Sequence, residues 1–444
     1  MLGAKNLTEG GIFRQLTNLA FPIMATSFVQ MAYSLTDMAW VGRIGSESVA
    51  AVGSVGILVW LTSSVAYIPK IGAEISVAQS IGGNKSDEAR QYASHTTTIA
   101  LILSLIVALI LFSAAEFIIS FFKLAPHISE NAVDYLRIVS TAFPFVFLVL
   151  TFSGIYNASG RSQIPFYLTA TGLVLNMILD PLFILGIGSF EGLGTKGAAI
   201  ATWISQGVVF LLFVWQMKRA NGILNRFTYF IKPQKKHTTR IFKLGLPITL
   251  MNILFASINM YMARIASTYG GHIGVMSQTT GGQIEGITWN TSQGFSTALS
   301  TFVAQNYAAG KPDRMKKAYK YTLMLLSGLG IIVTIAFIFF GFHIFGIFVP
   351  EESAKIAGGE YLAIVGISQL FMMFELTTQG MFNGTGRTLP PAIISITFNI
   401  ARIPLALFLA PIMGTNGVWW AITISTIIKG IISPAWYQFT SKSK

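Results

Sequence analysis

Cysteine is absent from this chain of 444 residues, and charged residues make up only 11% of it. Without cysteine the chain can form neither disulfide bonds nor thiolate metal sites. Soluble domains carry about 25% charged residues, because charge covers their surface. With less than half of that fraction and with 53% hydrophobic residues, much of the surface of this chain must face lipid. The composition therefore excludes a set of soluble domains.

Acidic residues are scarce as well, with 17 aspartates and glutamates against 30 lysines and arginines and a formal net charge of +13. A basic balance can indicate a nucleic-acid partner, unless the positions of the cations along the chain have another cause. The five histidines are dispersed at or near the ends of the hydrophobic stretches. They form no histidine-rich, Ser/His or metal-spaced group there, so the sequence does not predict an enzyme.

Twelve stretches are apolar over about the 20 residues that a helix needs to cross the hydrocarbon core. They are residues 12–37, 49–81, 94–122, 133–157, 164–188, 193–217, 241–266, 278–309, 320–349, 357–382, 390–411 and 416–438. The first lacks a charged start and a small-residue cleavage site, which favours a mature helix over a signal peptide. The sequence therefore predicts an all-α integral membrane protein with twelve transmembrane helices.

The basic residues follow the order of these spans. They concentrate after the second, fourth, sixth, eighth and tenth spans and in the carboxy-terminal tail, for example as Lys85, Arg161, Lys236, Lys316, Arg387 and Lys444. The other loops hold scattered cations such as Arg43 and Lys123. Because lysine and arginine are retained on the cytoplasmic side, the pattern predicts two cytoplasmic termini. It also accounts for the net charge without a nucleic-acid partner.

An internal duplication organises the chain. Three blocks recur in one order: Val77-Ala78-Gln79 as Val303-Ala304-Gln305, Asn157-Ala158-Ser159-Gly160-Arg161 as Asn383-Gly384-Thr385-Gly386-Arg387, and Gly194-Thr195-Lys196-Gly197 as Gly414-Thr415-Asn416-Gly417. The first two blocks recur at one and the same offset along the chain. Pro22 in the first span likewise corresponds to Pro247 in the seventh. This agreement indicates two copies of one six-span half.

The duplication predicts an amino-terminal lobe of residues 1–218, a basic cytoplasmic linker of residues 219–240 and a carboxy-terminal lobe of residues 241–444. Each half has an even number of spans, so we expect two pseudo-symmetric six-helix bundles in the same orientation, related by an axis along the membrane normal. Channels are more often oligomeric rings around a pore. The duplication therefore favours a transporter whose halves rock to open a central cleft to either side.

Two aspartates, Asp37 and Asp180, are the most informative charges within the spans. An ionisable side chain at mid-bilayer costs about 2.5–3.5 kcal/mol on insertion scales and marks a functional site by default. Asn176 and Asp180 are four residues apart and so share a helix face. Pro181 lacks a backbone N–H and frees a carbonyl near the carboxylate. The structural alternative is that both aspartates lie at helix ends, touching water and capping neighbouring helices.

Either of two ions suits this pair of carboxylates. Carboxylate, amide and hydroxyl oxygens from different helices can hold a hard cation. Alternatively, repulsion between like charges in a medium of low dielectric constant favours protonation of one carboxyl, and the pair then carries a proton. Uptake of either ion could couple transport to a gradient.

Five further charges lie inside the spans. Lys70 and Glu74 are four residues apart, and we expect a structural pair near the cytoplasmic end of the second span. Glu285, Glu375 and Arg402 occupy the eighth, tenth and eleventh spans. Because neither glutamate has a cation near it in sequence, we expect a Glu–Arg pair in the second half. That pair would act as a fixed brace or as a substrate anchor.

At these residues the chain resembles the multidrug and toxic compound extrusion (MATE) transporters. The resemblance covers nearly all of the chain. Its motifs are Asp37-Met-Ala-Trp-Val-Gly42-Arg43-Ile-Gly45, Val77-Ala-Gln79 with Gly82-Gly83-Asn84, Asn157-Ala-Ser-Gly160, Gln283-Ile-Glu285-Gly286 running to Val303-Ala-Gln305-Asn306, and Asn383-Gly-Thr-Gly-Arg387.

The resemblance implies a secondary active antiporter, without a cofactor, that exports small organic cations or amphipathic drugs in exchange for Na⁺ or H⁺. In the DinF-like and archaeal branch an amino-lobe cation site uses Asp, Asn, Asp and Thr, and the matching positions here are Asp37, Asn176, Asp180 and Thr202. The resemblance also implies a monomer among the lipids of a prokaryotic inner membrane, with no nucleic-acid partner.

The chain departs from the family pattern at one position. The NorM-like branch places an acidic residue in the seventh span about eight residues after the proline, where this chain has Phe255. That part of a second-half site is missing, unless Glu285 and Glu375 replace it. An alternative function within the same superfamily is a flippase for a lipid-linked precursor, which would need a cationic cavity to hold pyrophosphate.

Overall fold

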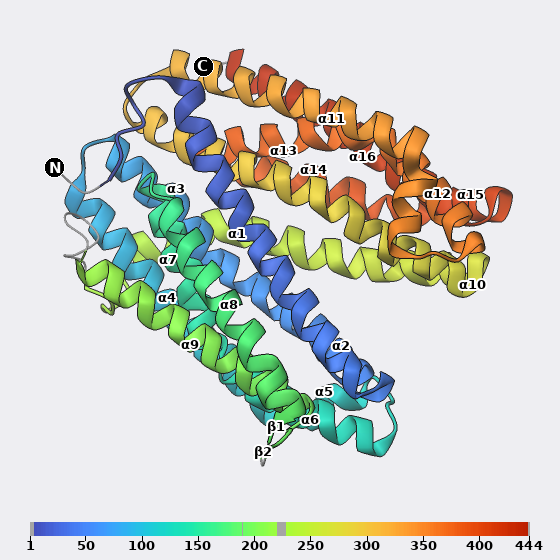
Figure 1. Ribbon diagram of the computed structural model, residues 1–444. Helices are drawn as coiled ribbons and strands as arrows, with labels where there is room; N and C mark the ends of the chain where they lie inside the picture. Colours follow the sequence, from blue (N-terminus) through green and yellow to red (C-terminus); the bar gives the residue numbers. More distant parts are fainter. Residues whose placement is uncertain (1–3, 189, 220–227, 443–444) are drawn as a thin grey trace. The chain divides into compact units, whose positions relative to one another are not determined.

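The computed structural model describes residues 4–188, 190–219 and 228–442. Its helices (Figure 1) are α1 Ile12–Val41, α2 Ser46–Ser63, α3 Tyr67–Gly82, α4 Ser86–Ser113, α5 Ala115–Ser120, α6 Pro126–Ser140, α7 Phe143–Ala158, α8 Gln163–Leu185, α9 Thr195–Arg219, α10 Lys235–Ala308, α11 Pro312–Phe348, α12 Glu352–Gly366, α13 Gln369–Gly384, α14 Leu389–Ile400, α15 Arg402–Met413 and α16 Thr415–Lys442. Two 3₁₀ turns, η1 Gly42–Ile44 and η2 Ser64–Ala66, flank α2. Strands β1 Gly186–Ile187 and β2 Phe190–Glu191 form one antiparallel hairpin, with Gly186 opposite Glu191.

The helices of the described residues account for the twelve predicted spans. Nine helices or helix runs are long and apolar enough to cross a membrane, and the bent pairs α6–α7 and α12–α13 bring the number to eleven. The long helix α10 contains a break at Gly271, whose φ of 57° is one that glycine adopts readily. Counting its two parts separately gives twelve. The prediction of an all-α membrane protein is confirmed, apart from the short hairpin between α8 and α9.

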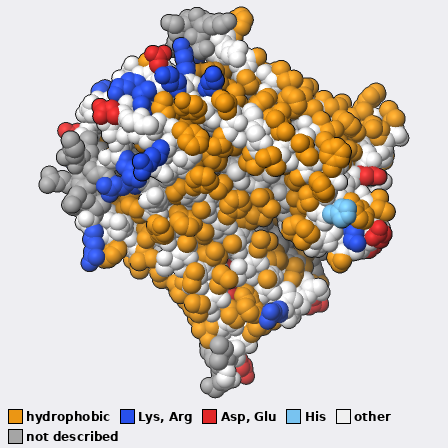
Figure 2. Space-filling model, turned by 45° about the horizontal axis from the view of Figure 1, so that its top comes forward, with side chains coloured by type: hydrophobic (Ala, Val, Ile, Leu, Met, Phe, Trp, Pro, Cys, Tyr) orange, Lys and Arg blue, Asp and Glu red, His pale blue; other side chains and the backbone are white. Residues whose placement is uncertain are grey.

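Large apolar side chains cover the outside of these helices. Leu109, Phe339 and Ile347 are 69%, 73% and 79% exposed, respectively. On the face drawn in Figure 2, hydrophobic side chains occupy most of the surface and charged side chains are few. Exposure of this extent is not stable in water, because apolar patches of this size associate or aggregate. The chain is therefore a multi-pass membrane protein.

The helices pack into two compact units. Unit 1 spans Met1–Leu7 and Ala25–Thr249, and unit 2 spans Thr8–Met24 and Leu250–Lys444. Helices α1 and α10 each pass from one unit to the other shortly after a proline, Pro22 in α1 and Pro247 in α10. The units thus exchange the first segment of each predicted half. Residues 220–227 of the predicted linker and Lys444 of the tail lie outside the described residues.

Close backbone contacts hold the exchanged segments. In unit 1, Thr249 Oγ1 donates to the carbonyl of Ser64 at 3.2 Å, and a Cβ on Gly245 would lie 2.4 Å from the carbonyl oxygen of Ile68. In unit 2, a Cβ on Gly294 would lie 2.8 Å from the Cβ of Met24. Glycine at both contacts lets helices approach closely, as is common in membrane proteins.

Candidate cation site

The four residues predicted to form an amino-lobe cation site come together in unit 1. Asp37 lies on α1, Asn176 and Asp180 lie on α8, and Thr202 lies on α9. Helices α8 and α9 run side by side (Figure 1). Asn176 and Asp180 are fully buried, at 0% exposure. The alternative that both aspartates merely touch water at helix ends is therefore excluded for Asp180, which lies within α8 immediately before Pro181.

One oxygen of each carboxylate is held by a neutral donor. Asn176 Nδ2 donates to Asp180 Oδ1 at 3.0 Å, and Thr202 Oγ1 donates to Asp37 Oδ2 at 3.2 Å. Asp37 and Asp180 also lie close enough for their charges to act on each other. The amide and the hydroxyl fix the orientation of the two carboxylates, but they bring no positive charge to offset them.

The remaining oxygens of the site have no hydrogen-bond partner among the described residues. They are Asp37 Oδ1, Asp180 Oδ2 and Asn176 Oδ1, and the hydroxyls of Tyr33 and Ser205 are unpaired as well. A buried polar atom without a partner costs about 1–3 kcal/mol. Two carboxylates, an amide oxygen and hydroxyls are the ligands that a hard cation prefers, and a shared proton would also satisfy the pair. The residues present therefore fit either ion.

Three residues near this site were not predicted from the sequence. Tyr33 precedes Asp37 by one turn of α1, a spacing that could have indicated it. Tyr135 on α6 is close enough for the charges of both aspartates to act on it, as they do on Tyr33. Ser205 follows Thr202 by three residues on α9. The sequence offers no local signal for Tyr135, because it reaches the site from a distant span.

Gly172 brings the Tyr33 hydroxyl against α8, one turn before Asn176. A Cβ at this glycine would lie 2.5 Å from Tyr33 Oη and 2.2 Å from a methyl carbon of Val209 on α9. Any larger residue would push α1 or α9 away from α8. The glycine therefore sets the spacing between the three helices that supply the site.

The charges within the spans of unit 2 pair differently from the prediction. Glu285 accepts hydrogen bonds from Tyr361 Oη and Gln369 Nε2, both at 2.7 Å. Glu375 forms an ion pair with Lys429, whose Nζ lies 3.1 Å from Glu375 Oε2, and also accepts a hydrogen bond from Ser395. The expected direct Glu–Arg pair is wrong, because Lys429 on α16 reaches Glu375 instead.

Arg402 is directed to hydroxyl groups and an aromatic ring. Its Nε donates to Ser425 Oγ at 2.8 Å and its Nη2 donates to Thr426 Oγ1 at 3.1 Å. The guanidinium carbon lies 5.8 Å from the ring centre of Phe255, within the range of a cation–π contact. Arg402 thus lies over Phe255, the position at which the sequence is expected to depart from the family pattern.

The predicted pair of Lys70 and Glu74 is also absent from the described ion pairs. Asn157 Nδ2 on α7 donates to Glu74 Oε1 at 3.2 Å, and Lys70 Nζ lies 5.0 Å from the ring centre of Tyr67. A lysine four residues before a glutamate is the less favourable order for a helical ion pair. Asn157 from another helix contacts Glu74 in place of Lys70, so tertiary packing decides the partner of this glutamate.

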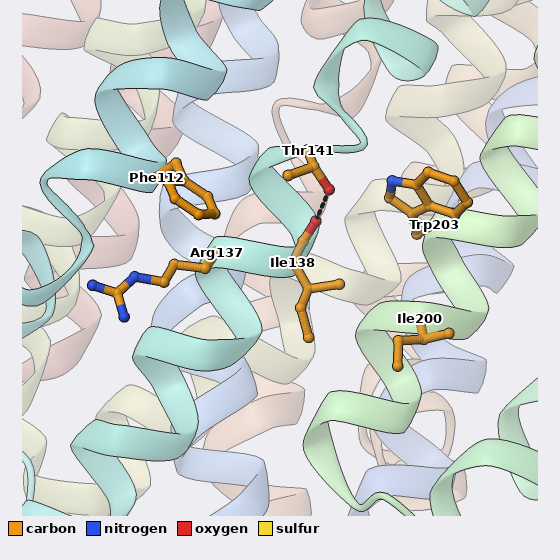
Figure 3. Close-up of a pocket in the computed structure, with 6 residues that line it drawn as sticks. All are labelled: Phe112, Arg137, Ile138, Thr141, Ile200 and Trp203. Carbon is orange, nitrogen blue, oxygen red and sulfur yellow. Dashed lines mark hydrogen bonds between the residues drawn. The ribbon is translucent and has the colours of Figure 1, made fainter.

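A shallow apolar groove lies elsewhere on unit 1 (Figure 3). Phe112, Ile138, Ile200 and Trp203 line it, and the guanidinium of Arg137 points away from Ile138, Ile200 and Trp203. Arg137 forms an ion pair with Glu116 at 2.8 Å instead. The groove has few polar groups to orient a ligand, and lipid chains suit such a surface better than an ion does.

Comparisons with known proteins agree with this architecture. The MatE family model matches twice, at residues 22–182 and 247–408, which together exceed half of the chain. Each match begins at one of the two corresponding prolines. The probable multidrug resistance protein NorM of Thermotoga maritima is 25% identical over 432 residues, covering 95% of this chain and 91% of that protein. The FAD transporter of Shewanella oneidensis is 24% identical over 430 residues, covering 96% and 94%, respectively.

Solved structures show the same fold. An outward-facing multidrug resistance MATE family transporter of the MOP superfamily has a TM-score of 0.91 at 23% identity, covering 99% of this chain and 98% of that one. A MOP superfamily transporter from Pyrococcus furiosus has a TM-score of 0.89 at 23% identity, covering 98% and 97%. With both halves matched by the family model, the chain belongs to the MatE family of membrane transporters.

Proposed function

We propose that this protein is a secondary active exporter that exchanges small organic cations or amphipathic compounds for Na⁺ or H⁺. The observation that carries the proposal is the pair Asp37 and Asp180, in which one buried carboxylate oxygen of each residue has no hydrogen-bond partner among the described residues. Two negative charges in a low-dielectric site favour uptake of a positive charge. The names of most of these relatives support drug export. One relative is named an FAD transporter, so an anionic substrate is the alternative to test.

The proposed mechanism is alternating access. Ion uptake at Asp37 and Asp180 would change the packing of α1 against α8 and α9, and the bend that follows would centre on Pro22. A mid-helix proline lacks the backbone donor and crowds the preceding turn, so a bend costs least there. Coupling requires that the ion and the substrate prefer opposite states by a real difference in free energy.

The test is ion-driven efflux of a fluorescent organic cation in proteoliposomes, with the Na⁺ and pH gradients varied separately. Asp37→Asn and Asp180→Asn should each abolish efflux, because each removes one of the two charges that attract the ion. Glu116→Gln, which removes a carboxylate that is 77% exposed, is the matched control and should behave as wild type. Undiminished efflux in both aspartate variants would show that the proposed site does not bind the coupling ion. Competition by FAD would assign the substrate to the anionic class.

We further propose that the protein lies in a prokaryotic inner membrane with both termini in the cytoplasm, which follows from the loop cations. The absence of cysteine makes this directly testable. A single cysteine at Lys316 should react with an impermeant maleimide only after the membrane is opened, whereas one at Lys123 should react in intact cells. The reverse labelling would invert the topology.

A further inference from the structure

Corresponding helices of the two units can be compared residue by residue. Pro22 in α1 corresponds to Pro247 in α10. Helix α8 begins at Gln163 and α14 at Leu389, and this offset is the one that the first two recurring motifs share. Helices α9 and α16 begin at Thr195 and Thr415, a shorter offset, because the β1–β2 hairpin lengthens the first copy. Carrying these three offsets along the helices assigns each residue of the unit 1 site a counterpart in unit 2.

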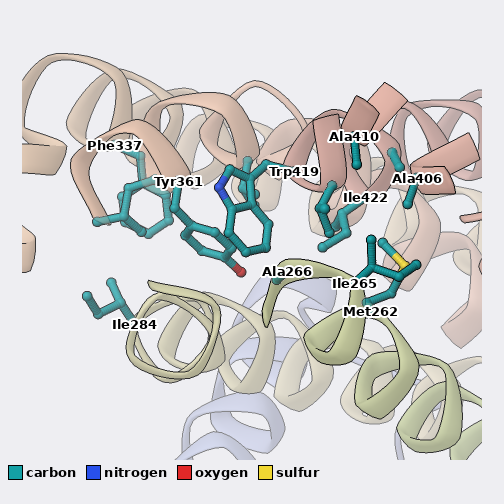
Figure 4. Packing of buried hydrophobic residues seen from close by; sticks show 14 of the residues in the cluster. Met262, Ile265, Ala266, Ile284, Phe337, Tyr361, Ala406, Ala410, Trp419 and Ile422 are labelled. Atoms are coloured by element: carbon teal, nitrogen blue, oxygen red, sulfur yellow. The ribbon is translucent and has the colours of Figure 1, made fainter. Parts of the chain in front are cut away.

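Most of these counterparts are apolar. They are Ile258 for Tyr33, Met262 for Asp37, Ala406 for Asp180 and Ile422 for Thr202. All four belong to one buried hydrophobic cluster of unit 2. Figure 4 shows Met262, Ala406 and Ile422 in this cluster, together with Tyr361 and Trp419. The second copy thus lacks both carboxylates of the first, and packed side chains fill the positions of the ion ligands.

Two counterparts are polar, and they contact each other. Arg402 corresponds to Asn176, and Ser425 corresponds to Ser205. In unit 1 the Ser205 hydroxyl has no partner among the described residues. In unit 2 the hydroxyl of Ser425 accepts a hydrogen bond from Arg402 Nε at 2.8 Å. The hydroxyl oxygen of Ser425 in unit 2 therefore accepts from a positively charged group, whereas the equivalent hydroxyl of Ser205 in unit 1 is unpaired among the described residues.

The charges around the second copy balance within the protein. Glu285 and Glu375 both act electrostatically on Arg402, and Lys429 pairs with Glu375. Tyr361, the counterpart of Tyr135, donates to Glu285 at 2.7 Å. The half-buried Glu285 and the buried Glu375 thus face two buried cations, whereas the two carboxylates of the unit 1 site face none among the described residues. Unit 2 needs no ion from solution to neutralise it.

We propose that unit 2 contains a converted copy of the cation site, in which the guanidinium of Arg402 is the resident cation. A tethered cation is present at high effective concentration and cannot leave. The coupling ion is consequently taken up in unit 1 alone, and the charge of unit 2 stays constant through the cycle. This inference rests on the proposed ion exchange and adds the identity of the group that replaces the second ion.

The experiment tests whether unit 2 binds a cation from solution once the guanidinium of Arg402 has been removed. The parent is D37N/D180N, which lacks the unit 1 site, and Arg402→Ala is added to it. Methylguanidinium chloride at millimolar concentration is the probe, choline chloride is the salt control, and the thermal unfolding midpoint of the purified full chain is measured. Binding to the folded state raises this midpoint.

Methylguanidinium should raise the midpoint of D37N/D180N/R402A and leave that of the parent unchanged. Arg402→Lys, which keeps a charge, and Arg264→Ala, which removes an exposed guanidinium from α10, should show no response in the same background. A folded R402A protein without a response, or an equal response of the parent, would overturn the proposal.

A second measurement does not depend on the folding of the Arg402 variants. Ion-driven efflux by D37N/D180N should be lost and should stay lost when Glu285→Gln is added. If efflux persists in D37N/D180N and Glu285→Gln abolishes it, unit 2 binds an ion from solution and this inference is wrong. If efflux persists whatever the state of Glu285 and Glu375, the proposed ion exchange itself fails.

Discussion

Lys429 Nζ lies 3.1 Å from Glu375 Oε2, and both side chains are only 7% exposed. The pair joins α13 to α16 inside unit 2, and Ser395 of α14 completes the hydrogen bonding of the carboxylate. A buried ion pair contributes little net stability when compared with well-packed apolar residues, but breaking it leaves an unpaired buried charge. Its two members therefore depend strongly on each other.

Lys429→Met should lower the free energy of unfolding by about 3–5 kcal/mol, because Glu375 is then left buried without a counter-charge. The double variant K429M/E375Q removes the orphaned charge and should recover most of the loss. Unfolding in detergent, followed by circular dichroism, measures both. Equal stability of the single and the double variant would show that the pair is not coupled.

Gly172→Ala should weaken ion-driven transport and destabilise unit 1 by about 1–3 kcal/mol through overpacking. The added Cβ would lie 2.5 Å from Tyr33 Oη and so displace α1 from α8 beside Asn176. Gly207→Ala is the matched control on α9, since its Cβ would lie 3.5 Å from Phe145, an ordinary contact. Similar transport rates for the two variants would contradict the spacing role of Gly172.

Thr202→Val should lower the apparent affinity for the coupling ion by about tenfold or more, since a hydrogen bond to a charged group is worth about 1.5–3 kcal/mol. The Thr202 hydroxyl orients Asp37, so Thr202→Ser should retain most of the affinity. Thr171→Val removes an exposed hydroxyl that bonds only to its own helix, at the carbonyl of Tyr167, and serves as the control. The ion concentration for half-maximal efflux is the measurement, and an unchanged value in T202V would remove Thr202 from the site.

Tyr361→Phe should destabilise unit 2 by about 1–3 kcal/mol, because the half-buried carboxylate of Glu285 loses the donor to its Oε2. Thermal unfolding measures the effect. In Y361F/E285Q the carboxylate charge is removed as well, so the second substitution should cost less in the Y361F background than alone. Strict additivity of the two changes would show that the hydrogen bond between Tyr361 and Glu285 is not an energetic coupling.

The twelve spans, the duplication and the membrane location could be predicted from the sequence because each depends on local or repeated information. Span length follows from runs of apolar residues, and the repeat follows from Pro22, Pro247 and the recurring glycine motifs. Asp37 and Asp180 could be found because a carboxylate in an apolar run stands out at once. Asn176 was accessible for a similar reason, since its i, i+4 spacing to Asp180 is a local property.

The partners of those charges could not be predicted in the same way. Glu74 contacts Asn157 instead of the expected Lys70. Glu375 pairs with Lys429, and Arg402 bonds to the hydroxyls of Ser425 and Thr426 instead of to a glutamate. All of these partners lie on other helices. Tyr135 approaches the candidate cation site in the same way, from a distant span. Helix periodicity specifies contacts within one helix only, whereas the choice among neighbouring helices depends on packing. The amino-acid sequence by itself thus establishes that carboxylates lie within the spans. The packing of the helices decides which of these carboxylates pair with a lysine or arginine and which do not.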